Sequence, residues 1–241
     1  MAKVFCVLSG KGGVGKSTFC ANIGKALSEN KKVLLIDGDI SFRSLDMLLS
    51  VDSMVVFDWS DVIFGRCVKE KARLFASENL HLLASPLSLP DSFDKEDFSR
   101  LISEYNEMYD YIFIDAPAGF GKFAEIYAKV SDTVIVIATP DDISLRAAYF
   151  VGERLTEMGI DENKMRLVLN KADYRKMRSG KQRNLDTAID KTYLRLLGVV
   201  PNDNSLVFTG EKGIYSISKR ANEAFSNISG RILGKDIKLY Y

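Results

Sequence analysis

A glycine-rich stretch near the start of the chain carries two lysines and a serine. Ser9 to Thr18 reads S-G-K-G-G-V-G-K-S-T, which contains the G-x-x-x-x-G-K-S pattern of a phosphate-binding loop between a strand and a helix. Glycines let the backbone turn so that successive N–H groups face phosphate oxygens. Lys16 is therefore expected at the β- and γ-phosphates of a nucleotide, and Ser17 as a ligand of Mg²⁺. The loop residues expected to bind the nucleotide are Gly12, Gly13, Val14, Gly15, Lys16, Ser17 and Thr18.

Two carboxylates follow apolar runs that have the composition of buried strands. Asp115 ends Y-I-F-I-D, and Asp39 ends V-L-L-I-D-G-D. The carboxyl ends of parallel strands meet at one edge of a sheet, so both acids are expected beside the phosphate loop. Asp115 is predicted to support Mg²⁺ through a water, and Asp39 to orient the water that attacks the γ-phosphate. The alternative is that Asp37, Asp39 and Asp115 only cap turns.

The elements that must position these residues alternate along the chain. Several apolar runs are continuous, which is typical of strands buried on both faces. Helical patterns lie between them, and this alternation predicts an α/β fold with one doubly wound, mostly parallel sheet flanked by helices. The length favours a single domain over residues 1–241. The expected strands are Val4–Leu8, Val33–Ile36, a weaker Leu80–Leu83, Tyr111–Ile114, Thr133–Ala138, Leu167–Leu169 and Leu196–Val200.

Helices are expected at Ser17–Ser28 and at Lys95–Tyr105, the second with Asp94 as its N-cap. The polar segment 173–184 is expected to be a mobile loop. Two apolar stripes at helical spacing are expected to pack on the sheet. The first consists of Ile143, Ala147, Phe150, Val151, Leu155 and Met158, and the second of Ile214, Ile217, Ala221, Phe225, Ile228 and Ile232.

Composition and charge narrow the class of protein. Apolar residues make up 46% of the chain and charged residues 27%, which is usual for a globular protein. The 33 Lys and Arg residues nearly balance 32 Asp and Glu residues, which argues against polyanion binding by the whole surface. Three widely spaced cysteines suggest neither a disulfide framework nor a metal site. Without a signal peptide or an apolar run of ~18 residues, the expected location is cytoplasmic, with at most peripheral association at the inner face of the cell membrane.

Lys11 is a second lysine in the loop, at a position where an ordinary phosphate loop does not need one. The stretch K-G-G-V-G-K-S-T resembles the deviant Walker motif of the MinD/ParA family of ATPases. This resemblance implies a catalytic role for Lys11, which would cross a dimer interface to the nucleotide of the partner subunit. Taken alone, Lys11 is more simply interpreted as a solvated lysine.

Other segments resemble the MinD branch of this family, so that the resemblance extends from about Lys3 to about Gly234. It implies that Gly119 contacts the γ-phosphate and that Asn170 contacts the base. V-V-P-N-D resembles the loop that covers the adenine, which implies nucleotide contacts for Pro201 and Asp203. The remaining matches are switch I at Asp37–Asp46, switch II at Asp115–Gly119, and a strand and helix at Ala138–Ala148.

The resemblance implies an ATPase that uses ATP and Mg²⁺. ATP would join two subunits as a homodimer, and slow hydrolysis, stimulated by a protein activator, would release them. The process would be spatial regulation, such as placement of the division site or the cell pole. Two departures stand out, because MinD proteins usually carry asparagine in place of Ser44 and usually end in a basic amphipathic helix. Here only Lys235–Tyr241 follows Gly234, so membrane association is expected to be weak.

Several alternatives stay open. Asn170–Asp173 reads N-K-A-D, the pattern with which many GTPases recognise guanine. An iron protein of the nitrogenase-reductase type would need two cysteines per subunit at a dimer axis, and Cys6, Cys20 and Cys67 are not expected there. A bacterial tyrosine kinase of related fold would carry a C-terminal tyrosine cluster, of which Tyr240 and Tyr241 form only a pair.

A DNA-partition ATPase is the main alternative of another functional class. Its ATP dimer would bind DNA without sequence preference, through the basic residues of segment 173–184. A solvated charged loop is the favoured interpretation of that segment, because the whole chain is nearly neutral. A structural protein that binds no nucleotide is the remaining possibility. The basic residues concerned are Arg175, Lys176, Arg178, Lys181 and Arg183.

Overall fold

The computed structural model describes residues 1–40, 42–206 and 217–239. Its strands form one sheet in the order β3-β4-β2-β5-β1-β6-β7-β8. Neighbouring strands are parallel, except that β3 runs antiparallel to β4 at one edge. The predicted doubly wound, mostly parallel sheet is therefore confirmed, whereas β3 was not expected. The strands are β1 (Lys3–Leu8), β2 (Val33–Asp37), β3 (Arg73–Phe75), β4 (Leu80–Leu83), β5 (Tyr111–Asp115), β6 (Thr133–Ala138), β7 (Met165–Ala172) and β8 (Arg195–Pro201).

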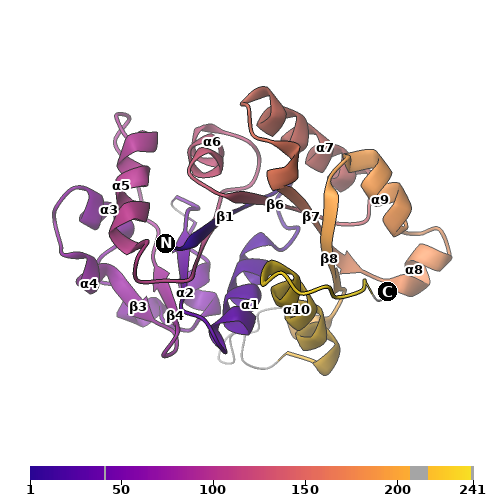
Figure 1. Cartoon of the computed structure of the whole chain (residues 1–241), viewed down its shortest axis with the longest axis horizontal. Helices are drawn as coiled ribbons and strands as arrows, with labels where there is room; N and C mark the ends of the chain where they lie inside the picture. The colour runs from indigo at the N-terminus through magenta and orange to yellow at the C-terminus, as the bar shows by residue number, and fades with distance from the viewer. Residues whose placement is uncertain (41, 207–216, 240–241) are drawn as a thin grey trace.

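Helices cover both faces of the sheet (Figure 1). The α-helices are α1 (Lys16–Ser28), α2 (Leu45–Leu48), α3 (Trp59–Ile63), α4 (Lys69–Ala72), α5 (Lys95–Tyr105), α6 (Lys122–Lys129), α7 (Asp142–Glu157), α8 (Tyr174–Arg178), α9 (Leu185–Thr192) and α10 (Lys219–Ile232). Short 3₁₀ turns lie at Asp52–Met54, Glu162–Lys164 and Asn204–Leu206.

Strand β1 shows why the apolar runs are continuous. Val4, Cys6 and Leu8 belong to a core on one face of the sheet, and Phe5 and Val7 to a core on the other face. Successive side chains of a strand point to opposite faces, so a strand covered on both sides needs apolar residues at every position. Helices α3, α5, α6, α7 and α9 contribute to the first core, and α1, α2 and α10 to the second (Figure 1).

Helix α5 begins as predicted at Asp94. The carboxylate of Asp94 accepts a hydrogen bond from the N–H of Asp97, and the carboxylate of Asp97 accepts one from the N–H of Asp94. This reciprocal capping box satisfies backbone donors that the first helical turn leaves free. Helix α10 begins at the N-cap Ser218 and buries the predicted stripe from Ala221 to Ile232. The predicted member Ile214 lies outside the described residues, as do Tyr240 and Tyr241.

The buried face predicted for α7 is right for Val151 and Leu155, which are buried, but wrong for Ile143 and Phe150. Ile143 is 71% exposed and Phe150 51% exposed. The buried residues of α7 include the small residues Ser144, Ala148 and Gly152 beside larger apolar ones. A Cβ at Gly152 would lie 3.5 Å from Leu194, so the buried side of α7 packs closely on its neighbours. Residue size decided the buried face, because bulky side chains at these positions would hold the helix away from the core.

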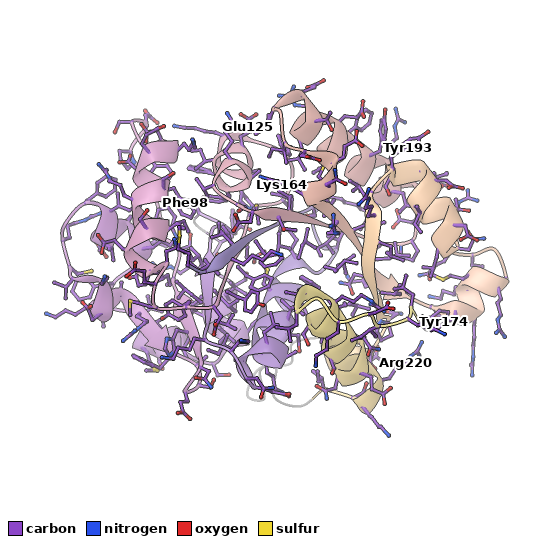
Figure 2. All side chains as sticks on the ribbon, in the orientation of Figure 1. Phe98, Glu125, Lys164, Tyr174, Tyr193 and Arg220 are labelled. Atoms are coloured by element: carbon purple, nitrogen blue, oxygen red, sulfur yellow. The ribbon has the colours of Figure 1, made fainter. Side chains whose placement is uncertain are left out.

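Segment 173–184 contains a helix where a loop was predicted. The carboxylate of Asp173 caps α8 by accepting the N–H groups of Arg175 and Lys176. Figure 2 shows Tyr174 of α8 near Arg220 of α10, and the guanidinium carbon lies 5.4 Å from the ring centroid. Asp173 was not predicted to be an N-cap, although aspartate is among the residues preferred at that position.

The chain folds back on itself after α10. Arg231 donates hydrogen bonds to the carbonyl oxygens of Ile237 and Lys238 at 2.9 and 2.8 Å, and to that of Leu197 in β8 at 3.0 Å. A Cβ at Gly230 would lie only 2.2 Å from the Ile237 side chain, so only glycine at position 230 leaves room for Ile237. The segment 235–239 is thus fastened to α10 and to the edge strand β8. Nowhere in the described residues is there a helix with the length and apolarity needed to cross a membrane.

Candidate functional site

The phosphate loop joins β1 to α1 at the edge where the parallel strands end. Gly13 and Gly15 have φ angles of 74° and 95°, a region that glycine adopts readily. A Cβ at Gly15 would lie 2.4 Å from Nδ2 of Asn170, so no larger residue fits there. The N–H groups from Gly12 to Thr18 have no acceptor within the described part of the chain, and no side chain caps α1. Such unpaired donors at a helix N-terminus form an anion-binding site.

Lys16 and Asp115 lie together beneath the loop. Nζ of Lys16 is 3.8 Å from Oδ1 of Asp115, and both side chains are almost completely buried. Neither carboxylate oxygen of Asp115 accepts a hydrogen bond of ordinary geometry in the described residues, although the Ser17 hydroxyl and the Cys20 thiol lie close enough to lower its pKa. Burial raises the pKa of Asp115, and the charge of Lys16 opposes this rise. An unpartnered buried carboxylate beside a loop that supplies the Ser17 hydroxyl offers the hard oxygen donors that Mg²⁺ prefers, so these residues fit the expected ion.

Asp37 shares this edge but has a structural role. It pairs in register with Asp115 across β2 and β5. Its carboxylate accepts the N–H groups of Ser44 and Leu45 at 3.0 Å and that of Asp39 at 3.1 Å. Asp37 therefore caps the turn that follows β2, as its alternative interpretation stated. Burial and the neighbouring charge of Asp115 raise the pKa of Asp37.

Asp39 is half-buried at the start of the segment that resembles switch I. Burial raises the pKa of its carboxyl group, and the charge of Lys16 counteracts part of that rise. The backbone before Asp39 is held firmly, because the Trp59 indole donates to the Asp37 carbonyl at 2.8 Å and Tyr127 donates to the Gly38 carbonyl at 3.2 Å. The fold therefore brings Asp39 into the electrostatic field of Lys16, as the water-orienting prediction requires.

Gly119 and Lys11 make contacts that nucleotide binding would have to replace. Gly119 has a φ angle of 87°, and its N–H donates to the carbonyl of Ser9 at 2.9 Å. Nζ of Lys11 lies 3.8 Å from Oδ1 of Asp141, and its side chain is 45% exposed. Asp141 also caps α7 through the N–H of Ser144. The expected contact of Gly119 with a γ-phosphate, and that of Lys11 with a partner's nucleotide, would each exchange one of these interactions.

A cavity of about 340 Å³ lies beside the loop and has the size expected for a small-ligand pocket. The ends of β7 and β8 form its other walls. Its lining joins residues predicted from distant parts of the sequence with residues that were not predicted. The predicted ones are Gly13, Gly15, Thr18, Asn170, Pro201 and Asp203, and the others are Phe19, Lys171, Val200, Asn202, Leu206 and Phe225.

Two acids near this cavity have carboxylates that are already engaged. Asp203 accepts hydrogen bonds from the N–H and hydroxyl of Ser205 and from the hydroxyl of Ser218, and these interactions lower its pKa. Asp203 thus ties the loop after β8 to the start of α10. Asp173, the last residue of N-K-A-D, caps α8 and is not among the residues that line the cavity.

A larger hollow lies elsewhere in the described structure. It measures about 750 Å³ and is open, and its lining includes Lys31, Lys32 and Asp110 at the opposite end of the strands. None of the predicted site residues lines it. The smaller cavity is therefore the candidate nucleotide site, because it adjoins the phosphate loop with its unpaired N–H donors.

Three residues that support the site were not predicted. Trp59 and Tyr127 fix the backbone at Asp37 and Gly38, and nothing in the local sequence indicates contacts over such separations. Lys171 donates from Nζ to the carbonyl of Gly13 at 2.7 Å. Lys171 is part of N-K-A-D, a pattern that by itself points to base recognition and not to a contact with the phosphate loop. His81, by contrast, is hydrogen-bonded to Tyr109 at 2.6 Å, away from the residues of the site.

Comparison with known proteins gives full-length matches. A family model described as "ParA: NUBPL iron-transfer P-loop NTPase" matches residues 1–235. The septum site-determining protein MinD of Bacillus subtilis strain 168 is 31% identical, over 99% of this chain and 92% of the relative. The MinC:MinD cell division protein complex of Aquifex aeolicus contains a chain with TM-score 0.88 and 31% identity, covering 100% of this chain and 99% of that one. MinD from Pyrococcus horikoshii OT3, complexed with Mg-ADP, has TM-score 0.81 and 26% identity, covering 98% of this chain and 100% of that one.

Proposed function

Because this chain belongs to the MinD/ParA family of P-loop ATPases, we propose that it binds and hydrolyses Mg²⁺-ATP as a nucleotide-switched homodimer in the spatial regulation of cell division. The observation that carries this proposal is the set of unpaired N–H groups from Gly12 to Thr18, beside the buried pair of Lys16 and Asp115. Donors and charges without partners in the protein are available to a polyphosphate and its metal ion.

The side chains suggest a division of labour during hydrolysis. Lys16 would contact the β- and γ-phosphates, while the backbone donors of the loop hold the phosphate oxygens. Bound Mg²⁺, held by Ser17 directly and by Asp115 through water, would neutralise charge on the phosphates. Asp39 would orient the attacking water, because its backbone is fixed through Asp37 and its carboxylate lies in the field of Lys16. The Mg-ADP bound to the Pyrococcus horikoshii relative supports this assignment of cofactors.

The geometry favours ATP over GTP. In the GTPase interpretation of N-K-A-D, the Asp173 carboxylate must reach the guanine base. Here that carboxylate accepts two N–H groups of α8 instead. We expect ATP to displace a fluorescent ATP analogue at concentrations at least about tenfold lower than GTP, and Asp173→Asn to leave this preference unchanged. Equal or tighter binding of GTP would contradict the proposal and favour a GTPase.

Partner binding is part of the proposal. The Aquifex aeolicus relative was solved as a MinC:MinD complex, which supports a protein partner for this chain as well. We propose that such a partner stimulates an intrinsically slow turnover. Steady-state ATPase rates measured across a range of protein concentrations, with and without the candidate partner, test this proposal.

DNA binding by the basic segment is less well supported. Arg183 and Lys191 both pair with Asp142, so part of the positive charge near α8 is already neutralised.

Membrane association is proposed to be weak, because the segment 235–239 is fastened to α10 and β8. Co-sedimentation of ATP-loaded Asp39→Ala protein with anionic liposomes, and separately with DNA, distinguishes these possibilities.

Iron transfer, which the matched family model's description mentions, has little support in this chain. Cys6 and Cys20 are buried in β1 and α1, and burial raises the pKa of both thiols. Cys67 is partly exposed in the turn between α3 and α4. Cluster ligation needs accessible thiolates that converge, and these three cysteines do not provide them.

A further inference from the structure

We propose that Asn170 and Lys171, at the carboxyl end of β7, form a clamp that holds two carbonyl groups of the phosphate loop and thereby aims its N–H groups at the nucleotide. This inference rests on the proposed nucleotide binding and gives Lys171 a positioning role. It concerns the loop before any nucleotide arrives, so it can also be tested on the free protein.

Two neighbouring side chains bind two neighbouring carbonyl groups. Nζ of Lys171 donates to the carbonyl of Gly13 at 2.7 Å, and Nδ2 of Asn170 donates to the carbonyl of Val14 at 2.7 Å. The orientation of the Asn170 amide is fixed as well, because its Oδ1 accepts the N–H of Lys171 at 2.9 Å. The clamp therefore connects β7 to the loop across more than 150 residues of sequence through two short hydrogen bonds.

Peptide geometry converts held carbonyl groups into aimed N–H groups. A trans peptide unit is planar, and its C=O and N–H bonds point in opposite directions. No cis peptide bond occurs in the described residues. Holding the carbonyl of Gly13 toward β7 therefore turns the N–H of Val14 away from β7, and holding the carbonyl of Val14 does the same for the N–H of Gly15. Neither N–H has an acceptor in the described part of the protein.

The backbone of β7 is distorted where the clamp forms. Adjacent side chains of a regular strand point to opposite faces of the sheet. In a regular strand, Asn170 and Lys171 could therefore not both reach the phosphate loop. Lys171 instead has a φ angle of 57°, in the left-handed region that lysine rarely adopts. The pairing of β7 with β8 shifts its register between Leu169 and Ala172. Backbone strain of this kind is typical of positions that serve a site.

A charged donor suits this position better than a neutral one. The lysine ammonium forms a charge-assisted hydrogen bond with the Gly13 carbonyl. Hydrogen bonds in series polarise one another, so this contact strengthens the Val14 N–H as a donor to phosphate. Lys171 also lines the cavity next to the loop, where its charge favours an anionic ligand.

Three substitutions at Lys171 distinguish the effect of its ammonium group from the effect of its left-handed backbone conformation. Lys171→Met removes the donor and keeps most of the length. Lys171→Asn also removes it but places there a residue that tolerates the left-handed region. Lys171→Arg keeps a cationic donor. We expect the Met and Asn variants to bind ATP and ADP about tenfold more weakly, with a raised KM and a much smaller change in kcat, and Arg to restore most of the loss.

A second measurement uses the protein without nucleotide. We expect Lys171→Met to shift the amide NMR signals of Val14 and Gly15 and to speed their hydrogen exchange, with the thermal midpoint nearly unchanged. Wild-type affinity in the Met variant, equal losses in the Met and Arg variants, or unchanged loop amides would each overturn the clamp. If the wild-type protein bound no nucleotide, the proposed function would be wrong, while the amide measurement would still decide whether Lys171 positions the loop.

Discussion

Asp115 is completely buried, and its carboxylate oxygens accept no hydrogen bond of ordinary geometry in the described residues, although Ser17 and Cys20 lie close enough to lower its pKa. Burying an unpaired carboxylate is unfavourable, so the nucleotide-free protein carries a local destabilisation at this point. The positive charge of Lys16, whose Nζ lies 3.8 Å from Oδ1 of Asp115, partly offsets this destabilisation. The same lack of partners leaves the oxygens available to the water shell of Mg²⁺, so the group that destabilises the free protein is the one proposed to support the ion.

The first prediction concerns how the destabilisation caused by buried Asp115 depends on pH. The pKa of Asp115 is raised, so the folded state holds the proton more tightly than the unfolded state does. Its contribution to stability is therefore present below the ordinary carboxyl pKa of ~4 and is lost as the pH rises through the raised value. We expect the free energy of unfolding of Asp115→Asn, relative to wild type, to increase from pH 4.5 to 8, as measured by urea titration without nucleotide.

Asp141→Asn provides the matched control. Although burial raises the pKa of Asp141, hydrogen bonds from Thr139 and Ser144 outweigh it, and the pKa is lowered overall. This carboxylate contributes stability above its ordinary pKa that is lost only as the pH falls, so its substitution should have a constant effect at pH 5–8. Asp115→Asn should also weaken Mg²⁺-dependent ATP binding. A pH-independent effect of Asp115→Asn would contradict the first prediction.

The second prediction concerns Asp39. We expect Asp39→Ala to lower the rate of ATP hydrolysis by ~10²- to 10⁴-fold, because the attacking water loses its orienting group, and to leave ATP affinity within about threefold. Asp39→Asn keeps the size of the side chain and should be similarly slow if the carboxylate itself is needed. Single-turnover rates and equilibrium binding separate the two effects. Lost affinity or unchanged turnover would exclude this role.

Among the elements, α7 shows how the site constrains a helix. A Cβ at Gly10 would lie 2.4 Å from the carbonyl oxygen of Ala147, so the backbone of the phosphate loop meets the backbone of α7 almost directly. Such an approach needs small residues where the helix meets its neighbours, and Ser144, Ala148 and Gly152 satisfy this need. The helix is consequently rotated so that bulky Phe150 faces outward.

The third prediction concerns the contact between α10 and the chain that follows it. We expect Arg231→Ala to lower the free energy of unfolding by about 1–3 kcal/mol, because the carbonyls of Leu197, Ile237 and Lys238 lose a charged donor. Urea titration measures this change. Lys219→Ala, which removes an exposed cation from the same helix, should leave the midpoint unchanged. Equal effects of the two substitutions would show that the contact does not stabilise the fold.

The whole molecule places the site at one edge of the sheet. β5 lies between β2 and β1, so the residues after β2, at the end of β5 and after β1 are neighbours although some of them are more than 100 residues apart. Val7 and Asp37 both pair in register with Asp115. The strand order, and not proximity along the chain, therefore brings together the phosphate loop, Asp115 and Asp39, for which we propose the Mg²⁺-supporting and water-orienting roles.

The fourth prediction concerns association of two molecules. We expect Lys16→Ala to weaken ATP binding by about 100-fold, because the phosphates lose a charged donor. Lys11→Ala should keep binding within a few-fold but prevent ATP-dependent dimerisation, since Lys11 is exposed and pairs only loosely with Asp141 within one chain. Light scattering with ATP and with ADP measures the dimer. A Lys11→Ala protein that still dimerises with ATP would exclude the proposed role across the interface.

The sequence by itself determined the parts of this protein whose chemistry lies in contiguous residues. The phosphate loop needs a fixed order of glycines, lysine and serine, and Asp94 caps a helix through residues next to it in the chain. Strands buried on both faces are also visible locally, because every position must be apolar. The fold class followed from how these local patterns alternate along the chain.

Only the tertiary structure decided the contacts between distant segments. Lys171 with Gly13, Trp59 with the Asp37 carbonyl, and Arg231 with Leu197 each join groups whose meeting depends on strand order and close packing. The buried face of α7 was decided in the same way, because several of its faces carry apolar residues and only the close approach of neighbouring segments, such as the phosphate loop at Ala147 and Leu194 at Gly152, requires small ones. Local patterns record which residues avoid water, whereas packing decides which of them meet.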